Sequence, residues 1–223
     1  MTPWRQACEE ALRRHSEADA IRAWGFSREA SGGSRAPFNY RLEHSRAVVK
    51  LARWLCPRVG ADLEVVECAA WLHDATKSLG HGAERDCHAQ EAAEAAEAIL
   101  EGTDFPRGKV EAVRSAIRHH VGLRLAHRLE PLEAAVLWDC DKLSKIGAAS
   151  LVHFTCVAGA FQAIETGDIL RRGQAWLDLA EGIAESMNTE PARIEAGRRL
   201  EFLKRHYEQL AREWADPTEP CPT

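Results

Sequence analysis

The sequence lacks the cysteine pattern of a disulfide framework or of a zinc knuckle. Its seven cysteines are an odd number, and no pair has the spacing Cys-x-x-Cys. Cysteines without such a pattern are typical of small buried residues in a reducing compartment, so we expect a cytoplasmic protein. The chain also lacks an apolar N-terminal segment of signal-peptide length, and charges interrupt every later apolar stretch. We therefore expect neither export nor a membrane span.

The charge of the chain bears on nucleic-acid binding, and its periodicity bears on the fold class. A formal charge of -5 without a block of basic residues gives no surface suited to nucleic acid, so we expect no nucleic-acid partner. Alternating strand patterns are almost absent, whereas apolar residues recur at helical spacing almost everywhere. With 223 residues, of which 45% are hydrophobic, the chain is expected to form a single all-α domain, a helical bundle.

Turn residues separate the helices that this periodicity predicts. The predicted helices cover residues 3–24, 40–56, 62–76, 86–101, 107–120, 131–147, 173–186 and 190–215, with a broken region at 149–165. We expect residues 1–35 to be an N-terminal helix and a linker that pack on a domain of residues 36–223. The last helix carries an apolar stripe as far as Trp214, which packs either on this domain or on a second copy in a homodimer.

Five of these segments place a titratable side chain on the same face as their apolar residues. His44, for example, stands four and seven residues before Val48 and Leu51, and Asp141 stands four residues after Leu137. The inward residues found in this way are His44, His73, Asp74, His88, His120 and Asp141. A buried carboxylate is costly unless a metal ion or a basic group compensates it, and basic residues are scarce on these stripes. The sequence therefore predicts a bound cation.

The chemistry of these side chains indicates which cation. Imidazole and carboxylate together suit Mn, Fe, Co, Ni or Zn, whereas a magnesium site would be richer in oxygen. With no cysteine in the set, we expect a catalytic centre of one or two divalent transition-metal ions rather than a structural zinc site. The alternative is that single inward histidines are hydrogen-bonded core residues, which stays open for His88, for His120 and above all for His119.

Three segments in a fixed order, "EHSRAVVKLA", "AAWLHDATK" and "LWDCDKLSKIGA", resemble the HD-domain metal-dependent phosphohydrolases. The pattern of that family is a His, a later His-Asp pair and a final Asp. The segment "MNTEPARIEAGRRLEFLKRHYEQLAREW" is similar to the C-terminal half of a bacterial HD hydrolase subgroup. The stretches "HAQEAAEAAEAIL" and "AIRHHVG" resemble HD proteins with two metals, including those that split symmetrical dinucleoside tetraphosphates. Relatives that degrade cyclic di-GMP carry a Glu where this chain has Tyr40, which argues against a third metal and that substrate.

The resemblance implies an HD-domain fold and a metal-binding role for specific residues. The ligands of a first ion would be His44, His73, Asp74 and Asp141, with Asp74 as a bridge to a second ion held by His88 and His120. The implied activity is hydrolysis of a phosphoester or phosphoanhydride by metal-activated water, on a small phosphorylated molecule such as a nucleotide.

Two further residues are candidates for contact with the substrate. Lys77 shares the helical face of His73 and Asp74, so its ammonium group can hold a phosphate oxygen near the metal. Asp74 and Lys77 are accordingly the candidate catalytic residues, and a solvated salt bridge is the alternative for Lys77. His119 is a second candidate for substrate binding. Arg124, Lys142 and Lys145 could extend this anion site, but we expect each of them to be an exposed charge.

Two other functions fit the same set of side chains. A few HD relatives hold two irons and oxidise carbon substrates with dioxygen, and the six predicted ligands do not forbid this chemistry. A module that binds a ligand without turnover is the other alternative. The complete set of ligands argues against it, because an inactive protein has no need of a costly buried charge cluster.

Overall fold

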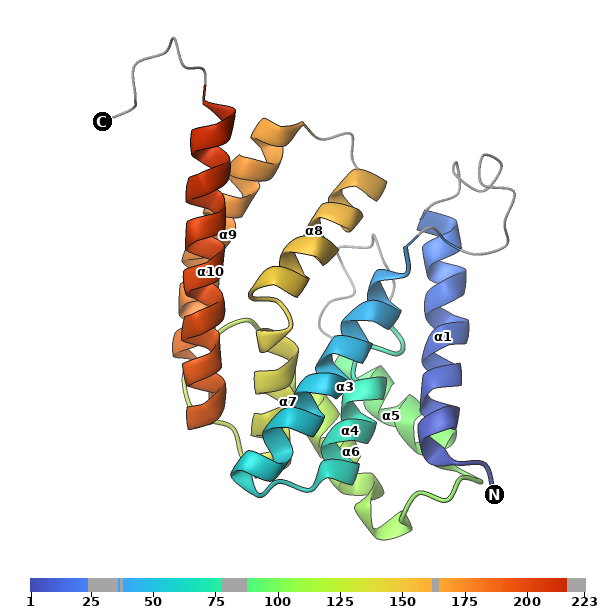
Figure 1. The fold of residues 1–223 in the computed structure, drawn as a ribbon. Helices are drawn as coiled ribbons and strands as arrows, with labels where there is room; N and C mark the ends of the chain where they lie inside the picture. The colour runs from blue at the N-terminus through green and yellow to red at the C-terminus, as the bar shows by residue number, and fades with distance from the viewer. Residues whose placement is uncertain (24–35, 37, 78–87, 162–164, 216–223) are drawn as a thin grey trace.

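The computed structural model describes residues 1–23, 36, 38–77, 88–161 and 165–215, which are drawn in colour in Figure 1. These described residues form helices and no sheet, which confirms the predicted all-α fold. The helices are α1 (Trp4–Ala23), α3 (Tyr40–Val59), α4 (Leu63–Leu72), α5 (His88–Leu100), the 3-10 helix η1 (Arg107–Lys109), α6 (Val110–His119), α7 (Leu132–Leu143), α8 (Ala148–Phe161), α9 (Thr166–Glu185) and α10 (Glu190–Trp214). None of them is long and apolar enough to cross a membrane.

Helix α4 lies in the core of the bundle. Every residue from Val65 to Leu72 is buried, and α1, α3, α6 and α7 all pack against this helix. A helix that is buried on all sides must be apolar almost all round, as this one is. The Asp62 carboxylate caps its N-terminus by accepting hydrogen bonds from the backbone N–H groups of Glu64 and Val65. The packing of α4 in the core therefore fixes the position of His73 and Asp74, which follow this helix directly.

The two ends of the chain cover opposite sides of this core (Figure 1). Helix α1 packs against α3, α4 and α5, and the Trp4 ring makes an edge-to-face contact with Phe105, with ring centroids 5.3 Å apart. On the other side, α9 and α10 lie antiparallel, and α10 contacts α7. Helix α8 stands between this pair and α3, and most of its described side chains are only half-buried.

Several predicted boundaries differ from the structure. The region 149–165, predicted as broken, contains the continuous helix α8. Helix α9 begins at Thr166 rather than at residue 173, because the side chains of Glu165 and Asp168 form a capping box that apolar periodicity does not reveal. Helices α4 and α7 end a few residues earlier than predicted. Most of the predicted linker and the first two residues of the predicted helix 86–101 lie outside the described residues.

Candidate metal centre

Five of the predicted ligands lie at or near helix ends. His73 is the C-cap of α4, His120 is the C-cap of α6, and Asp141 lies in the last turn of α7. His88 is the first described residue of α5, and His44 lies in the second turn of α3. The sixth predicted ligand follows the α4 cap directly. Because the C-terminal end of a helix carries a partial negative charge, three such ends at one place favour a cation between them.

The first group of side chains that can hold a metal ion consists of His44, His73 and Asp141. All three side chains are buried. The Nε2 atom of His44 lies 3.3 Å from Nε2 of His73 and 3.1 Å from Oδ1 of Asp141. The Nε2 atom of His73 lies 3.9 Å from the same carboxylate oxygen. Three potential ligand atoms from three helices therefore face one another within the reach of a single ion.

Hydrogen bonds at Nδ1 leave the Nε2 atoms of this group without protons. The Nδ1 atom of His73 lies 2.9 Å from the carbonyl oxygen of Ala70, so Nδ1 must be the protonated nitrogen. The Ser144 hydroxyl donates to the Asp141 carbonyl at 2.6 Å and therefore accepts from Nδ1 of His44 at 3.1 Å. In the neutral rings both Nε2 lone pairs point at each other and at a carboxylate. That arrangement is repulsive unless a cation lies among them.

The second group consists of Asp74, His88 and His120. The Oδ1 atom of Asp74 lies 3.9 Å from Nε2 of His88 and 3.6 Å from Nε2 of His120. The Oδ2 atom of the same carboxylate lies 3.8 Å from Nε2 of His73 and 4.0 Å from Nε2 of His44. Asp74 thus presents one oxygen to each group, which is the arrangement that a bridging ligand requires.

Two observations show that the second group also fits a cation. The Nδ1 atom of His120 lies 2.5 Å from the carbonyl oxygen of Ile117, which again leaves Nε2 as the free lone pair. The Oδ1 atom of Asp74 is buried and makes no hydrogen bond among the described residues, where its polar neighbours are the Lys77 ammonium at 3.5 Å and the two imidazole nitrogens of this group. A metal ion among these atoms would give the oxygen a close partner.

Besides Lys77, three basic side chains lie beside these carboxylates. The Nη1 atom of Arg41 is 2.9 Å from Oδ2 of Asp74, and both Lys142 and Lys145 form ion pairs with Asp141. The prediction that basic groups are scarce here is therefore wrong. The prediction that Lys142 and Lys145 are exposed charges is also wrong: Lys142 lies on α7, which is buried on all its sides from Ala134 to its end, and Lys145 follows this helix with a side chain that is only 22% exposed. Helical spacing cannot select one buried face on a helix that is surrounded.

Burial and neighbouring charge set the protonation of the first group. Burial lowers the pKa of His44 to about 4 and the pKa of His73 to about 3, so both rings are neutral at pH 7. Burial alone would raise the pKa of Asp141, but the two lysine ammonium groups hold that pKa well below its ordinary value. Burial alone would likewise raise the pKa of Asp74, but the neighbouring positive charges of Arg41 and Lys77 help to hold that pKa well below its ordinary value. Neutral imidazole and ionised carboxylate are the forms that bind a divalent metal.

The two candidate substrate-binding residues lie in different places. The Nζ atom of Lys77 is 3.5 Å from Oδ1 of Asp74, and its side chain is 39% exposed, so it reaches both the centre and the solvent. His119 is exposed, and its Nδ1 atom bonds the Ser115 carbonyl of its own helix at 2.7 Å, which places it outside both groups. Arg124 is exposed as predicted.

The structure adds three residues that the sequence did not suggest. Arg41 binds Asp74, Ser144 fixes the His44 ring, and the Tyr40 ring stacks on His44 with centroids 5.7 Å apart. Arg41 stands three residues before His44 and Ser144 three after Asp141, so each shares a helical face with a ligand. The spacing could have indicated that Arg41 and Ser144 lie near the predicted ligands, although it does not predict which residue each of them contacts.

The fold and the site together define an all-α protein with a histidine and aspartate centre suited to divalent metal. Residues 41–146, just under half of the chain, match the family model of the HD domain, a domain that binds divalent metals. This part of the chain is therefore similar to HD domains, in agreement with the sequence resemblance. No curated protein sequence matches the chain significantly.

Solved structures of HD proteins share the fold over nearly the whole chain. An HD-superfamily hydrolase from Bacillus thuringiensis has a TM-score of 0.57 at 20% identity, over 89% of this chain and 98% of that one. A predicted HD-superfamily hydrolase from an uncultured Thermotogales bacterium has a TM-score of 0.60 at 21% identity, over 96% and 95%. Bacillus subtilis YpgQ in complex with ADP has a TM-score of 0.57 at 20% identity, over 90% and 96%. At these identities the likeness shows the fold alone.

Proposed function

We propose that the protein is a metal-dependent phosphohydrolase that cleaves a phosphoester or phosphoanhydride bond. The observation that carries this proposal is the pair of unprotonated Nε2 atoms on His44 and His73, which face each other and the ionised Asp141 carboxylate. These atoms fit a divalent cation, and the basic side chains beside them fit an anionic substrate. A module without turnover would have no need of a buried charge cluster as costly as this one.

Each residue of the centre has a defined part in this proposal. A first ion would be held by His44, His73, Asp74 and Asp141, and a second ion by Asp74, His88 and His120. When bound, such ions polarise a phosphoryl group and lower the pKa of the attacking water. Lys77 reaches the solvent with its ammonium beside Asp74, so it can hold a phosphate oxygen as a point charge. The Arg41 guanidinium holds the Asp74 carboxylate in place.

A nucleotide is the substrate class that we favour within this reaction. The support comes from YpgQ of Bacillus subtilis, a protein of the same fold that has been crystallised with ADP. The ligand set favours Mn, Fe, Co or Ni as the metal, because imidazole and carboxylate bind these ions well.

The proposal is tested by metal removal and reloading. Protein purified anaerobically is stripped with a chelator, reloaded with Mn, Fe, Co or Ni in turn, and assayed for phosphate or pyrophosphate release from nucleoside phosphates and dinucleoside tetraphosphates. We expect no release from the stripped protein and recovery with at least one metal. A protein that consumes dioxygen with iron, and releases no phosphate with any metal, would instead be an oxidase of the same fold.

A further inference from the structure

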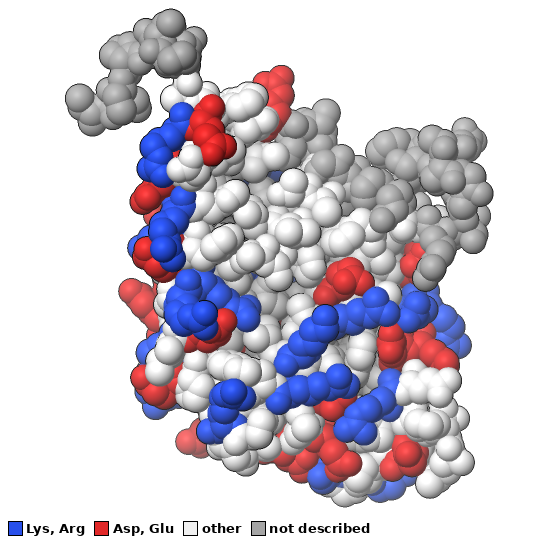
Figure 2. All heavy atoms as spheres, in the orientation of Figure 1, with Lys and Arg blue, Asp and Glu red and all other residues white. Residues whose placement is uncertain are grey.

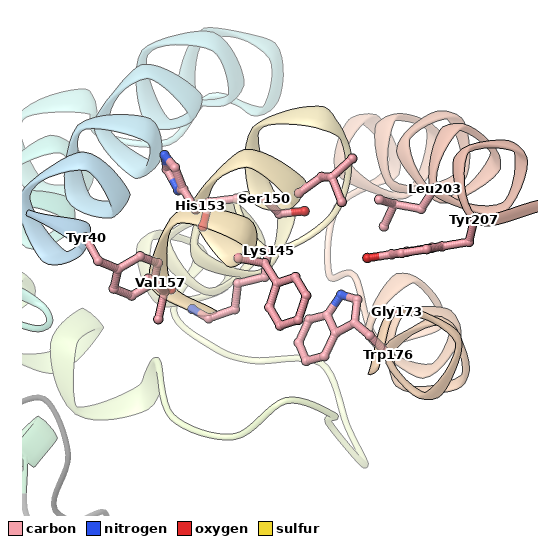
Figure 3. A pocket seen from close by; sticks show the side chains of 12 residues that line it. Tyr40, Lys145, Ser150, His153, Val157, Gly173, Trp176, Leu203 and Tyr207 are labelled. Atoms are coloured by element: carbon pink, nitrogen blue, oxygen red, sulfur yellow. The ribbon is translucent and has the colours of Figure 1, made fainter. Parts of the chain in front are cut away.

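An apolar pocket lies directly beside the metal centre, on the side away from α1. Its volume is about 310 Å³, and it is lined by residues of α3, the end of α7, α8, α9 and α10. Figure 3 shows Tyr40 on one side of the pocket and Trp176 and Tyr207 on the other, with the Lys145 side chain between them. Phe154, from α8, completes the aromatic lining. The proposed phosphohydrolase reaction has so far given this pocket no role.

Three residues belong both to the wall of the pocket and to the surroundings of the metal ligands. The Tyr40 ring stacks on His44, the Ser144 hydroxyl accepts from Nδ1 of His44, and the Lys145 ammonium pairs with Asp141. A molecule in the pocket is therefore separated from the ligands by a single layer of side chains. The phosphate of a substrate whose ring lay in the pocket would approach the candidate ligands past this layer, beside Lys145.

The opposite end of the pocket is built to receive a flat apolar group. Phe154 and Trp176 are only half-buried, although they are large aromatic side chains. The ring of Tyr207 lies against Gly173, where an added Cβ would come within 1.9 Å of a ring atom, so glycine is required for this wall. Figure 2 shows that the surface over α8 is free of charge on this face, whereas charged side chains crowd the part over the lower end of α3.

We propose that this pocket binds an aromatic ring of the substrate, and that Phe154 and Trp176 determine the specificity for it. The proposal rests on the proposed phosphohydrolase function and narrows its substrate class to phosphates that carry an aromatic group. The described residues that line the pocket include no Asn, Gln, Asp or Glu, and two of its polar groups, Ser144 and Lys145, are already bonded to the candidate metal ligands. We therefore expect stacking and shape, which tolerate different bases, to contribute most to recognition of the ring. Both residues lie outside the matched HD domain.

Equilibrium binding tests this assignment without any need for turnover. Metal-loaded protein is titrated calorimetrically with phenyl phosphate, AMP, glycerol phosphate and inorganic phosphate. We expect both aromatic probes to bind roughly tenfold or more tightly than the other two, because stacking of one ring contributes on that order. Tighter binding of AMP than of phenyl phosphate would assign a nucleoside, and equal binding would assign aryl phosphates in general.

Variants of the two aromatic residues identify the part of the pocket that matters. Trp176→Ala and Phe154→Ala should each weaken the aromatic probes roughly tenfold and leave inorganic phosphate unchanged, while Trp176→Phe keeps most of the affinity. The matched controls are Trp214→Ala and Phe202→Ala, at side chains that are 58% and 39% exposed on α10 and do not line this pocket. A melting curve establishes that each variant is folded.

Two results would overturn the assignment of the pocket. One is equal affinity of the wild-type protein for aromatic and non-aromatic phosphates. The other is a loss in the variants that is the same for inorganic phosphate as for phenyl phosphate, because the aromatic residues would then only support the fold. Failure of the proposed reaction looks different, since the aromatic probes would still bind with this preference although no phosphate is released.

Discussion

Two buried aspartates on α7, Asp139 and Asp141, stand two residues apart and meet opposite surroundings. Asp139 is 0% exposed and accepts four hydrogen bonds, from the backbone N–H groups and the side chains of Asn188 and Thr189, at 2.7 to 3.0 Å. Asp141 is 2% exposed and faces imidazole nitrogens without protons. Neutral donors satisfy the first carboxylate, whereas the second pairs with the Lys142 and Lys145 ammonium groups and also faces the free ring nitrogens of two candidate metal ligands. Burial alone therefore does not mark a functional acid, but the nature of its partners does.

Substitution of the candidate metal ligands, the group to which Asp141 belongs, should have the largest effect. His73→Ala, Asp74→Ala or Asp141→Ala should abolish metal binding and turnover, because each removes a ligand that no neighbour can replace. Asp74→Ala should also destabilise the fold by about 3–5 kcal/mol, since it leaves Arg41 buried without its partner. Metal content and urea unfolding measure both effects. The control is His15→Ala on the exposed part of α1, and wild-type metal content in any ligand variant would contradict the assignment.

Asp139→Ala should produce the reverse result. It leaves the buried donors of Asn188 and Thr189 without an acceptor, so the free energy of unfolding should fall by about 3 kcal/mol. Metal content should stay at the wild-type value in the protein that remains folded. If folded Asp139→Ala protein contained less metal than the wild type, Asp139 would also contribute to metal binding, and the contrast with Asp141 would be wrong.

The number of metal ions that the protein binds can also be determined with variants. Wild-type protein prepared anaerobically should hold two equivalents of metal, while His88→Ala and His120→Ala should each hold close to one, because the first group remains complete. Elemental analysis of the three proteins decides this. If both variants retain the wild-type content, the two histidines are core or substrate residues and the centre holds a single ion.

The sequence predicted the six side chains that the structure brings together in two groups. Each of them stands in helical register with apolar residues, so the register correctly predicted that these side chains point into the protein. The same rule failed on α7, which is buried all round, and so Lys142 was assigned to the surface. Neither the Arg41 contact with Asp74 nor the pocket beside α8 follows from one helix alone. Both depend on how several helices pack, which periodicity does not encode.

Substitution of Lys77, a candidate substrate-binding residue, should have a smaller effect than loss of a metal ligand. Lys77→Ala should keep the metal but lower kcat/KM roughly tenfold to hundredfold, because a charge-assisted contact to phosphate contributes about 1.5–3 kcal/mol. The matched control is Lys50→Ala, an exposed lysine on α3 away from the ligands. Unchanged kinetics with every active substrate would make Lys77 a surface residue that only pairs with Asp74.

The smallest expected effect concerns Glu67, a buried carboxylate that the protein satisfies with two arginines. The Nε atom of Arg5 lies 3.0 Å from Oε1, and Nη2 of Arg53 lies 2.6 Å from the same oxygen. Burial alone would raise the pKa of Glu67, but the two guanidinium groups hold this pKa below its ordinary value. The charge therefore stabilises the fold fully above the unfolded-state pKa of about 4.3, and the contribution is lost as the pH falls through the lower pKa of the folded state.

Glu67→Gln should accordingly lower the free energy of unfolding by about 1 kcal/mol at neutral pH, a modest value because both arginines are half-exposed and water can solvate them. The difference from wild type should shrink as the pH is lowered below about 4, where the wild-type carboxyl also becomes neutral. Urea unfolding of both proteins at several pH values measures this, and at each pH the variant should have the same metal content as the wild type. A difference that stays constant with pH would mean that shape, and not charge, stabilises this contact, and that Glu67 belongs with neither aspartate of α7.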